Sequence, residues 1–505
     1  MGFLKISAII AIIFSYIMMK LISNGSRLTY LCSIFNYGCT DPSHFTLTAD
    51  SYYDPRFERA VNQFINNFKK GHDIGSTFTV YYKGEKVVDV ACGYKDEKLT
   101  KPYGRRNLQL VYSTSKSLCT IAIALLVDRG VLKYSDKISK HWPEFTQGNK
   151  ENVTISELVQ HKSGLHFFTS GKQLTLEELK DLDGLSKILE KEPHIFGGEP
   201  KLAYHFQSLG HWINEIVRRV DPKHRSLHYF IQDEIAKPLN IDFKFLLTKK
   251  EFEEDFAPTF SFPKLLLYTY TYPKLLIYQP LRKYLGYNQT LSGLRHYLNT
   301  SSEMFRANNI YDKNYALDYT NDYETYTAEM PGFNMVTNAA SLGKLAGLIA
   351  NGGELNGTRL LKKETVKLMT QHDKTISDYD VLLEKNFVKP IGGLGYQDKS
   401  ALSVLRGETN YIGWGGFGGS FFGFNMELNF GMSYVPNALG DPAQGIDHRG
   451  LKLVSTVYEI IDYEAAKERL YDTGREILKD LITEGLGGGS SDTVAETETE
   501  NVDEL

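Results

Sequence analysis

The chain has 505 residues, of which 42% are hydrophobic and 23% charged, and these values are ordinary for a globular protein with a large core. Its formal net charge is -4, so nothing in the charge balance favours a nucleic-acid partner, and we expect none. Four cysteines without a C-x-x-C pair are too few for a disulfide scaffold.

The N-terminal segment, residues 1–22, predicts a signal peptide or a single membrane anchor, so membrane contact through this segment is one expectation. Its uncharged run spans about 21 Å as a helix, which is shorter than a bilayer core of about 30 Å. Lys5 and Lys20 flank the run on both sides, so they leave its orientation open. A polar linker, residues 23–50, follows, in which Cys32 and Cys39 could pair only in an oxidising compartment.

The C-terminal segment, residues 483–505, is rich in glycine and serine and then acidic, and we expect it to be disordered. Its last residues, Val-Asp-Glu-Leu, resemble a K-D-E-L retrieval signal, and the alternative is an acidic tail that ends this way by chance. Both ends together predict the secretory pathway, either the endoplasmic reticulum lumen or a membrane-anchored form, with secretion as the alternative.

The first half of the chain alternates between strand and helix patterns. Residues 56–69 have the apolar spacing of an amphipathic helix, and residues 77–82 and 86–92 alternate like a hairpin closed at Gly84. Residues 111–130 then form a helix that is apolar on nearly every side, and mostly helical patterns continue to about residue 240.

The second half opens with an aromatic insertion, residues 260–287, which we interpret as a lid or a membrane-touching patch. Residues 337–351 then predict a helix, residues 411–436 strands, and residues 464–481 a final amphipathic helix. Strands at both ends with helices between them indicate one α+β domain, residues 51–482, whose antiparallel sheet is completed late in the chain.

The start of the apolar helix carries the main chemical signal, because Ser113 and Lys116 are three residues apart and share one face of a helix. A serine that opens the helix lies near the positive end of its dipole. Apolar surroundings push a lysine amine toward its neutral form, which suits proton abstraction. Two other S-x-x-K patterns start at Ser261 and Ser341, but only Ser113 opens a long buried helix. The alternative is a serine N-cap with a snorkelling lysine.

Two later segments complete a recognisable order of motifs. Tyr204 precedes an amphipathic helix, and residues 411–420 are a glycine-dense strand whose bare backbone can approach a ligand closely. This combination resembles the serine β-lactamase and penicillin-binding-protein superfamily, on the class C β-lactamase and esterase branch, over residues 55–460. The H-K-S-G-L run at 161–165 is similar to the family's H-T-S-G-L. The resemblance implies an antiparallel sheet flanked by helices plus a mainly helical subdomain, in a eukaryotic β-lactamase-related domain protein.

The resemblance also implies roles for single residues. Ser113 would attack the carbonyl, Lys116 would be its proton partner, and Tyr204 would match the acid–base tyrosine of the Y-x-N motif. The K-T-G strand would fall on three consecutive residues of the late strand, Trp414, Gly415 and Gly416. Backbone N–H groups of Ser113 and Phe417 would then form the oxyanion hole.

Two departures from the family pattern shape the expected activity. Phe206 stands where Y-x-N has asparagine, so one polar contact to the lysine or the substrate is lost unless His205 or Gln207 replaces it. Trp414 stands where K-T-G has lysine, so the strand offers no cation to a substrate carboxylate. We therefore expect an esterase-like serine hydrolase that acts on a small-molecule ester or amide and needs no metal or organic cofactor.

Several alternatives remain open at this stage. The chain could be a catalytically inactive member that uses the fold for binding or assembly, or a peptidase of the D-aminopeptidase type, although no residue singles out the acid that such a peptidase needs. Trp414 could line the pocket or only pack the strand. His161 and His166 fit structural loop roles, and His224 with His228 gives half of a metal site without a third ligand. The sequence does not indicate an oligomeric state.

Overall fold

The computed structural model describes residues 44–96, 98–260, 299–396, 411–440, 448–465 and 467. The expected signal peptide or anchor, nearly all of the aromatic insertion and the acidic tail lie outside these described residues. The chain divides into two compact units, Met1–Thr456 and Val457–Leu505, and the sheet and the candidate site both belong to the first unit. The domain boundary expected at residue 482 stays a prediction.

The first unit is built on a seven-stranded antiparallel sheet with the order β1-β3-β2-β15-β14-β13-β12. The predicted hairpin is present, and its first strand pairs with β15 from the far end of the chain, Thr79 lying opposite Ser433. The N-terminal hairpin thus begins a sheet that the C-terminal strands complete, which confirms the expected α+β fold. The strands of this sheet are β1 (Tyr52–Tyr53), β2 (Gly75–Tyr82), β3 (Glu85–Gly93), β12 (Gly395–Tyr396), β13 (Ile412–Gly415), β14 (Phe421–Asn425) and β15 (Phe430–Pro436).

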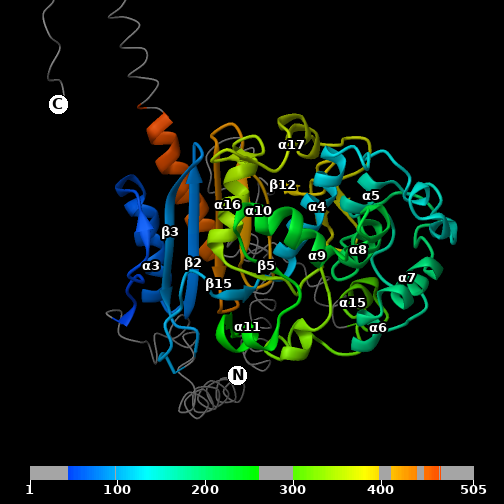
Figure 1. Ribbon diagram of the computed structural model, residues 1–505, viewed down its shortest axis with the longest axis horizontal. Coiled ribbons are helices and arrows are strands. Elements are labelled where there is room, and N and C mark those ends of the chain that lie inside the picture. The colour runs from blue at the N-terminus through cyan, green and yellow to red at the C-terminus, as the bar shows by residue number, and fades with distance from the viewer. Residues whose placement is uncertain are drawn as a thin grey trace, which may run out of the picture. The chain divides into compact units, whose positions relative to one another are not determined.

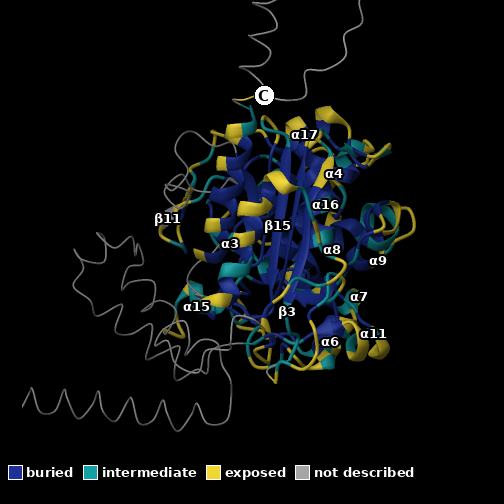
Figure 2. Ribbon diagram, turned by 90° about the vertical axis from the view of Figure 1, so that its left-hand side faces the viewer, coloured by how far each residue is buried: buried dark blue, intermediate teal, exposed yellow. Residues whose placement is uncertain are grey.

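Helix α3 (Glu58–Lys69) lies on one face of this sheet and α16 (Ala339–Ala350) on the other (Figure 1). Side chains of β2 alternate between these faces. Phe78 stacks on Phe64 of α3 with ring centroids 6.0 Å apart, whereas Thr79 lies beneath Gly343 of α16. Strands β2, β14 and β15 are buried throughout, whereas α3 exposes its outer side (Figure 2). Both helices confirm the amphipathic or apolar patterns that predicted them.

The contact between α16 and the sheet is unusually close. A Cβ atom on Gly347 would lie 2.4 Å from the Tyr81 side chain, and one on Gly431 would lie 2.2 Å from the backbone of Ala346. Only glycine leaves room for the helix and strand backbones to approach this closely. The glycines of α16 therefore have a packing role, which explains their presence in a segment that otherwise consists mostly of residues that favour helices.

A mainly helical subdomain lies between β3 and α16 in the chain and is packed around the buried helix α4 (Lys116–Asp128) (Figure 1). Helix α8 (Leu209–Val220) packs against α4. A second, smaller sheet of order β5-β7-β4-β6 stands at the start of α4. Its strand β4 leads directly into the segment that carries Ser113. These short strands are β4 (Leu108–Leu110), β5 (Phe243–Lys244), β6 (Phe256–Ala257) and β7 (Val336–Thr337).

The remaining described helices are mostly short. They are α5 (Ile155–Val159), α6 (Leu176–Lys180), α7 (Leu182–Lys191), α9 (Leu227–Ile231), α10 (Lys237–Leu239), α11 (Lys249–Glu254), α15 (Glu303–Ala307) and α17 (Lys363–Met369). Residues 448–465 are also helical, so helical structure begins well before the predicted start at residue 464. That start was wrong because Leu453 and Val454, with Val457 one turn later, already form an apolar stripe at helical spacing.

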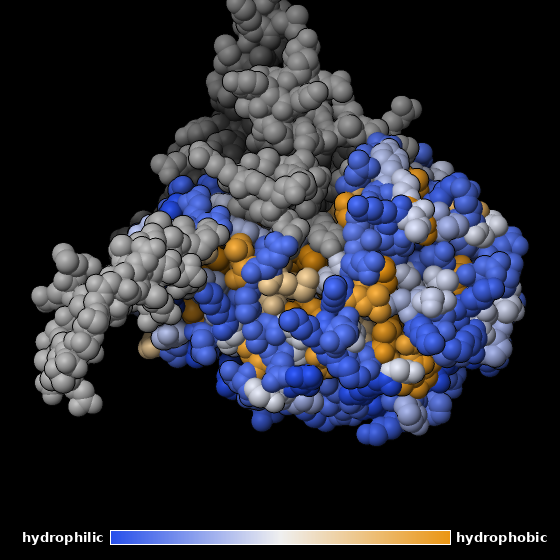
Figure 3. Space-filling view, turned by 90° about the horizontal axis from the view of Figure 1, so that it is seen from above, coloured by the Kyte–Doolittle hydropathy of each residue, from blue (hydrophilic) through white to orange (hydrophobic). Residues whose placement is uncertain are grey.

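The described surface gives no sign of a membrane span. Among the residues that the structure describes, no helix combines the length and the apolar character needed to cross a bilayer. Seen from above, the surface is largely hydrophilic, and hydrophobic side chains gather only in small areas (Figure 3).

Candidate active site

Ser113 lies in a tight turn rather than at the first position of α4. Strand β4 ends at Leu110, a 3₁₀ turn, η3 (Tyr112–Ser115), follows, and α4 begins at Lys116. Ser113 is partly exposed, whereas the residues on both sides of it are buried. Tyr112 has a φ of 47°, which a bulky side chain rarely adopts, and such local strain is concentrated at functional sites. The expectation that Ser113 itself opens α4 is therefore wrong, because α4 begins three residues later, at Lys116.

Lys116 is fully buried beside this turn. Its Nζ lies 3.1 Å from the Ser113 Oγ and donates to two backbone carbonyls, that of Phe206 at 2.7 Å and that of Gly332 at 2.6 Å. Burial lowers the pKa of the Lys116 amine to about 7, because desolvation penalises its charged form. The amine is therefore close to half neutral at physiological pH.

The polar contact expected from an asparagine at position 206 comes instead from the main chain, since the Phe206 carbonyl accepts from Lys116. Of the two open alternatives, replacement by His205 or Gln207 is not what the structure shows, because both side chains bond elsewhere. The His205 ring is buried in the scaffold, with Nε2 at 2.9 Å from the Ser163 Oγ and Nδ1 at 2.7 Å from the Ala203 carbonyl. The Gln207 Oε1 accepts from the Ile310 N–H at 3.2 Å. A backbone acceptor carries no side-chain signature, so the sequence could not reveal it.

Tyr204 joins Ser113 and Lys116 at one place. The Lys116 Nζ lies 5.2 Å from the centroid of the Tyr204 ring. Burial raises the pKa of the Tyr204 hydroxyl, and hydrogen bonds with Ser113 and Trp414 act in the opposite direction. The structure thus brings the three predicted catalytic residues together, although they come from a turn, a helix and a distant loop.

Trp414 packs directly against Tyr204, and its expected role in lining a substrate pocket stays a prediction. It is buried in β13, and its ring stacks on Tyr204 at 6.1 Å and on His161 at 5.6 Å between centroids. His161 is held by its backbone and ring, because its Nδ1 accepts the His205 N–H at 2.9 Å. His166 contacts Glu303 through Nε2 at 3.3 Å. Both histidines are thus placed in the scaffold around the tryptophan.

The turn after β13 is hydrogen-bonded to the turn that carries Ser113. The Ser420 Oγ donates to the Val111 carbonyl at 2.9 Å and lies 3.1 Å from the Thr114 Oγ1. A Cβ atom on Gly416 would lie 2.2 Å from the Val111 carbonyl oxygen, so glycine is needed for this approach. Gly415, which ends β13, leads into the same turn.

Phe417 sits at the tip of this turn, and its ring packs edge-on against Tyr112 at 5.4 Å. No backbone acceptor for the Phe417 N–H occurs within the described ranges. The turn thus places Phe417 beside the Ser113 turn, and the role of the Phe417 N–H in an oxyanion hole stays a prediction. Arg449, which the sequence did not single out, donates to the Gly418 carbonyl at 2.6 Å and so fixes the turn from behind.

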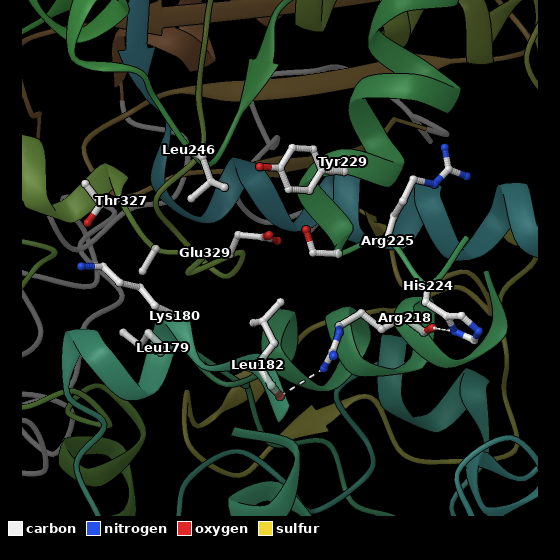
Figure 4. A pocket seen from close by; sticks show the side chains of 12 residues that line it. Leu179, Lys180, Leu182, Arg218, His224, Arg225, Tyr229, Leu246, Thr327 and Glu329 are labelled. Carbon is white, nitrogen blue, oxygen red and sulfur yellow. Dashed lines mark hydrogen bonds between the residues drawn. The ribbon is translucent and has the colours of Figure 1, made fainter. Parts of the chain in front are cut away.

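A separate cavity of about 410 Å³ lies in the helical subdomain (Figure 4). Leu182, Tyr229 and Leu246 surround the carboxyl of Glu329 there, and burial raises the pKa of this carboxyl to about 7. None of the predicted catalytic residues lines this cavity. His224 belongs to its rim, but no group of three or more metal-ligating side chains exists in the described part of the chain.

The fold and the site together define a β-lactamase/transpeptidase-like protein, with a buried lysine beside a serine and a tyrosine at the edge of an antiparallel sheet. Residues 61–455 match the family model described as Beta-lactamase. The chain belongs to the beta-lactamase family.

Known proteins resemble this chain over most of its length. "Esterase/beta-lactamase LipL" of Mycobacterium tuberculosis (strain ATCC 25618 / H37Rv) is 27% identical over 418 residues, covering 82% of this chain and 88% of its own. The crystal structure of a family VIII carboxylesterase has a TM-score of 0.65 at 24% identity, covering 82% of this chain and 100% of its own. EstA from Arthrobacter nitroguajacolicus Rue61a has a TM-score of 0.65 at 21% identity, with coverages of 82% and 99%. The two structures show a shared fold, and the expected eukaryotic subgroup stays a prediction.

Proposed function

We propose that this protein is a serine hydrolase that forms an acyl-enzyme at Ser113 and acts on small-molecule esters, in preference to β-lactams. The observation that carries the proposal is the meeting of the Ser113 hydroxyl, the buried Lys116 amine at 3.1 Å and the Tyr204 hydroxyl. Binding alone does not require a buried amine beside a serine, because such an amine is costly to desolvate.

The first step uses the neutral form of Lys116. A neutral amine has two N–H groups and one lone pair, and the carbonyls of Phe206 and Gly332 accept the two N–H groups. The lone pair is then left for the Ser113 hydroxyl. As the Ser113 Oγ bonds to the ester carbonyl carbon, its proton passes to Lys116, and the carbonyl oxygen becomes an oxyanion held by the N–H groups of Ser113 and Phe417.

The second step breaks the ester bond. The bond between the carbonyl carbon and the leaving oxygen cleaves. Tyr204, whose hydroxyl is hydrogen-bonded to Ser113 before the reaction, donates a proton to that oxygen. The proton taken up by Lys116 replaces the one that Tyr204 gives. A water molecule then attacks the acyl-enzyme and releases the acid by the same steps in reverse.

Esters are favoured over β-lactams because of Trp414 within β13. Trp414 fills the position of the K-T-G lysine with an indole that stacks on Tyr204, so the strand itself supplies no cation. The names of the relatives, an esterase/beta-lactamase and a carboxylesterase, support the same preference.

Hydrolysis of 4-nitrophenyl acetate and butyrate tests the proposal. Ser113→Ala should abolish turnover above the uncatalysed rate without loss of folding. Ser117→Ala is a matched control, because the Ser117 hydroxyl is buried one turn away and has no hydrogen-bond partner among the described residues. Equal activity of the wild-type protein and Ser113→Ala would contradict the proposal.

The rival function is a non-catalytic member used for binding or assembly. The specific observations in its favour are Phe206 and Trp414, which replace two polar side chains of the family pattern. Lys116→Met decides between the two functions. Unchanged turnover of every ester by Lys116→Met would favour the rival or a different nucleophile, whereas loss of turnover supports the hydrolase.

The proposed location is the secretory pathway, in the endoplasmic reticulum or on a membrane. Support comes from the apolar N-terminal segment and the Val-Asp-Glu-Leu terminus. Asn152 and Asn356 lie in N-x-S/T sequons and are exposed, so they are accessible to glycosylation. The full chain expressed in cells of its source should therefore shift in mobility on treatment with endoglycosidase H, and an unshifted band would argue against this location.

A further inference from the structure

Lys389 is a second buried lysine close to the active site, on the segment between β11 (Lys385–Asn386) and β12. Its Nζ lies 3.1 Å from the centroid of the Trp414 ring and 4.4 Å from that of Phe387. This Nζ is fully buried and has no hydrogen-bond partner among the described residues. The mechanism above does not use it.

The amine of Lys389 is buried without a hydrogen-bond acceptor among the described residues. A buried donor without an acceptor costs free energy, and a leucine or methionine would fill the same space without that cost. Burial lowers the pKa of Lys389 well below its ordinary range, which favours the neutral form of the amine. Proteins keep such unfavourable groups mainly where a ligand or a reaction compensates for them.

Two other polar atoms near Lys389 also lack hydrogen-bond partners among the described residues. His161 stacks on Trp414, and because its Nδ1 accepts a backbone N–H, its Nε2 carries the hydrogen and finds no acceptor in the described chain. The Asp380 Oδ1 accepts two backbone N–H groups, whereas its Oδ2 has no partner there. Asp380 and Lys116 are the charged groups that act on the pKa of Lys389, so all of these groups share one neighbourhood.

The position of Lys389 places it on the leaving-group side. Trp414 stacks on Tyr204, and the Phe387 ring lies 6.5 Å from Tyr204. Because Tyr204 gives its proton to the leaving oxygen in the proposed reaction, the side chains beyond Tyr204 face the far end of the leaving group. Phe387 is only partly buried and covers the Lys389 amine.

We propose that Lys389 binds a carboxylate on the leaving group, so that the preferred substrates are esters of carboxylate-bearing alcohols or phenols. The inference rests on the proposed hydrolase function and names its substrate class. The His161 Nε2–H is a second donor for the same carboxylate, and the amine takes up one proton from solvent as the anion binds.

Matched substrates test the substrate class. The acetyl esters of 3- and 4-hydroxybenzoate are compared with those of the corresponding hydroxybenzamides, which keep the shape and lack the charge. The ratio of kcat/KM for acid over amide should exceed unity in the wild-type protein and fall at least tenfold in Lys389→Met. Lys344→Met is the matched control, because it makes the same change at a partly buried lysine whose Nζ contacts the Leu239 carbonyl, and it should leave the ratio unchanged. An equal loss on both substrates would show that Lys389 only positions Trp414, and the inference would be overturned.

A binding measurement separates this inference from the hydrolase proposal. Calorimetry with Ser113→Ala protein measures binding of 4-hydroxybenzoate and 4-hydroxybenzamide without any turnover. We expect tighter binding of the acid, accompanied by proton uptake, and loss of both effects in Ser113→Ala/Lys389→Met. Equal binding of acid and amide would overturn the inference even if esters are hydrolysed at Ser113. Lys389-dependent binding of the acid would uphold it even if the proposed reaction failed.

Discussion

Lys116 sets the pH range in which the site can act. Its folded-state pKa is lowered from 10.5 to about 7 because the amine is fully buried. The neutral form is the proton acceptor, so the active fraction grows as pH rises through this value.

We therefore expect kcat/KM for a neutral ester to rise with pH and to level off above about pH 8. A pH–rate profile between pH 5 and 9 measures this directly. A profile that stays flat across this range would mean that the buried amine is not the base.

Tyr204 is the second residue whose role can be isolated. Its hydroxyl forms hydrogen bonds with Ser113 and Trp414. Substitution by phenylalanine removes this hydroxyl but keeps the ring that stacks on Trp414. Tyr204→Phe should lower kcat/KM for aryl esters by about 10² or more, the usual contribution of a general acid–base group. Its melting temperature should stay close to that of the wild-type protein, and unchanged kinetics would exclude Tyr204 as the proton relay.

Side-chain identity made some site residues predictable and others not. Ser113, Lys116 and Tyr204 are distinctive residue types at recognisable positions, and the structure brings them together. The Phe206 and Gly332 carbonyls could not be foreseen, because every residue has a carbonyl and only the fold selects which one meets the amine. Lys389 is one of many lysines in sequence, and only its isolation against Trp414 sets it apart.

Among the elements, the turn after β13 controls the distance between the oxyanion donors and the nucleophile. Gly416 faces the Val111 carbonyl so closely that any side chain would push the turn away from Ser113. A displacement of about 1 Å at an active site can cost about 10² in rate.

Gly416→Ala should accordingly lower kcat/KM by about that factor while the protein remains folded. Gly104→Ala is a suitable control, since a Cβ there would meet no atom nearer than 3.6 Å. Wild-type kinetics in Gly416→Ala would show that this turn does not form the oxyanion hole.

Most elements of the sheet followed from pattern alone, because strands with buried faces and amphipathic helices carry clear periodicity. The hairpin of β2 and β3, the helices α3 and α16, and the late strands all fall where the sequence predicts them. The second sheet, β4 to β7, was not foreseen, since its strands have only two or three residues and depend on partners distant in sequence. The 3₁₀ turn before α4 was not foreseen either. Tyr112 adopts there a backbone conformation that its residue type disfavours.

At the scale of the whole first unit, one buried ion pair links the sheet to the site. Arg449 donates to Asp73 at 2.6 Å, both side chains are at most 1% exposed, and the same arginine donates to the Gly418 carbonyl behind the oxyanion turn. Loss of one partner leaves an uncompensated buried charge.

Asp73→Asn should therefore destabilise the folded protein by about 3–5 kcal/mol, measured by chemical denaturation. Glu354→Gln, which breaks an exposed pair with Arg359, should cost less than about 1 kcal/mol. Equal effects of the two substitutions would contradict the structural role of the buried pair.

The account as a whole depends on Ser113 being the nucleophile, and covalent labelling tests this most directly. A fluorophosphonate probe should add to the folded protein at one site, and peptide mapping should find the adduct on Ser113. Labelling should slow as pH falls below about 7, because the amine then becomes charged. A folded protein that remains unlabelled, or that carries the adduct on another serine, would contradict the account.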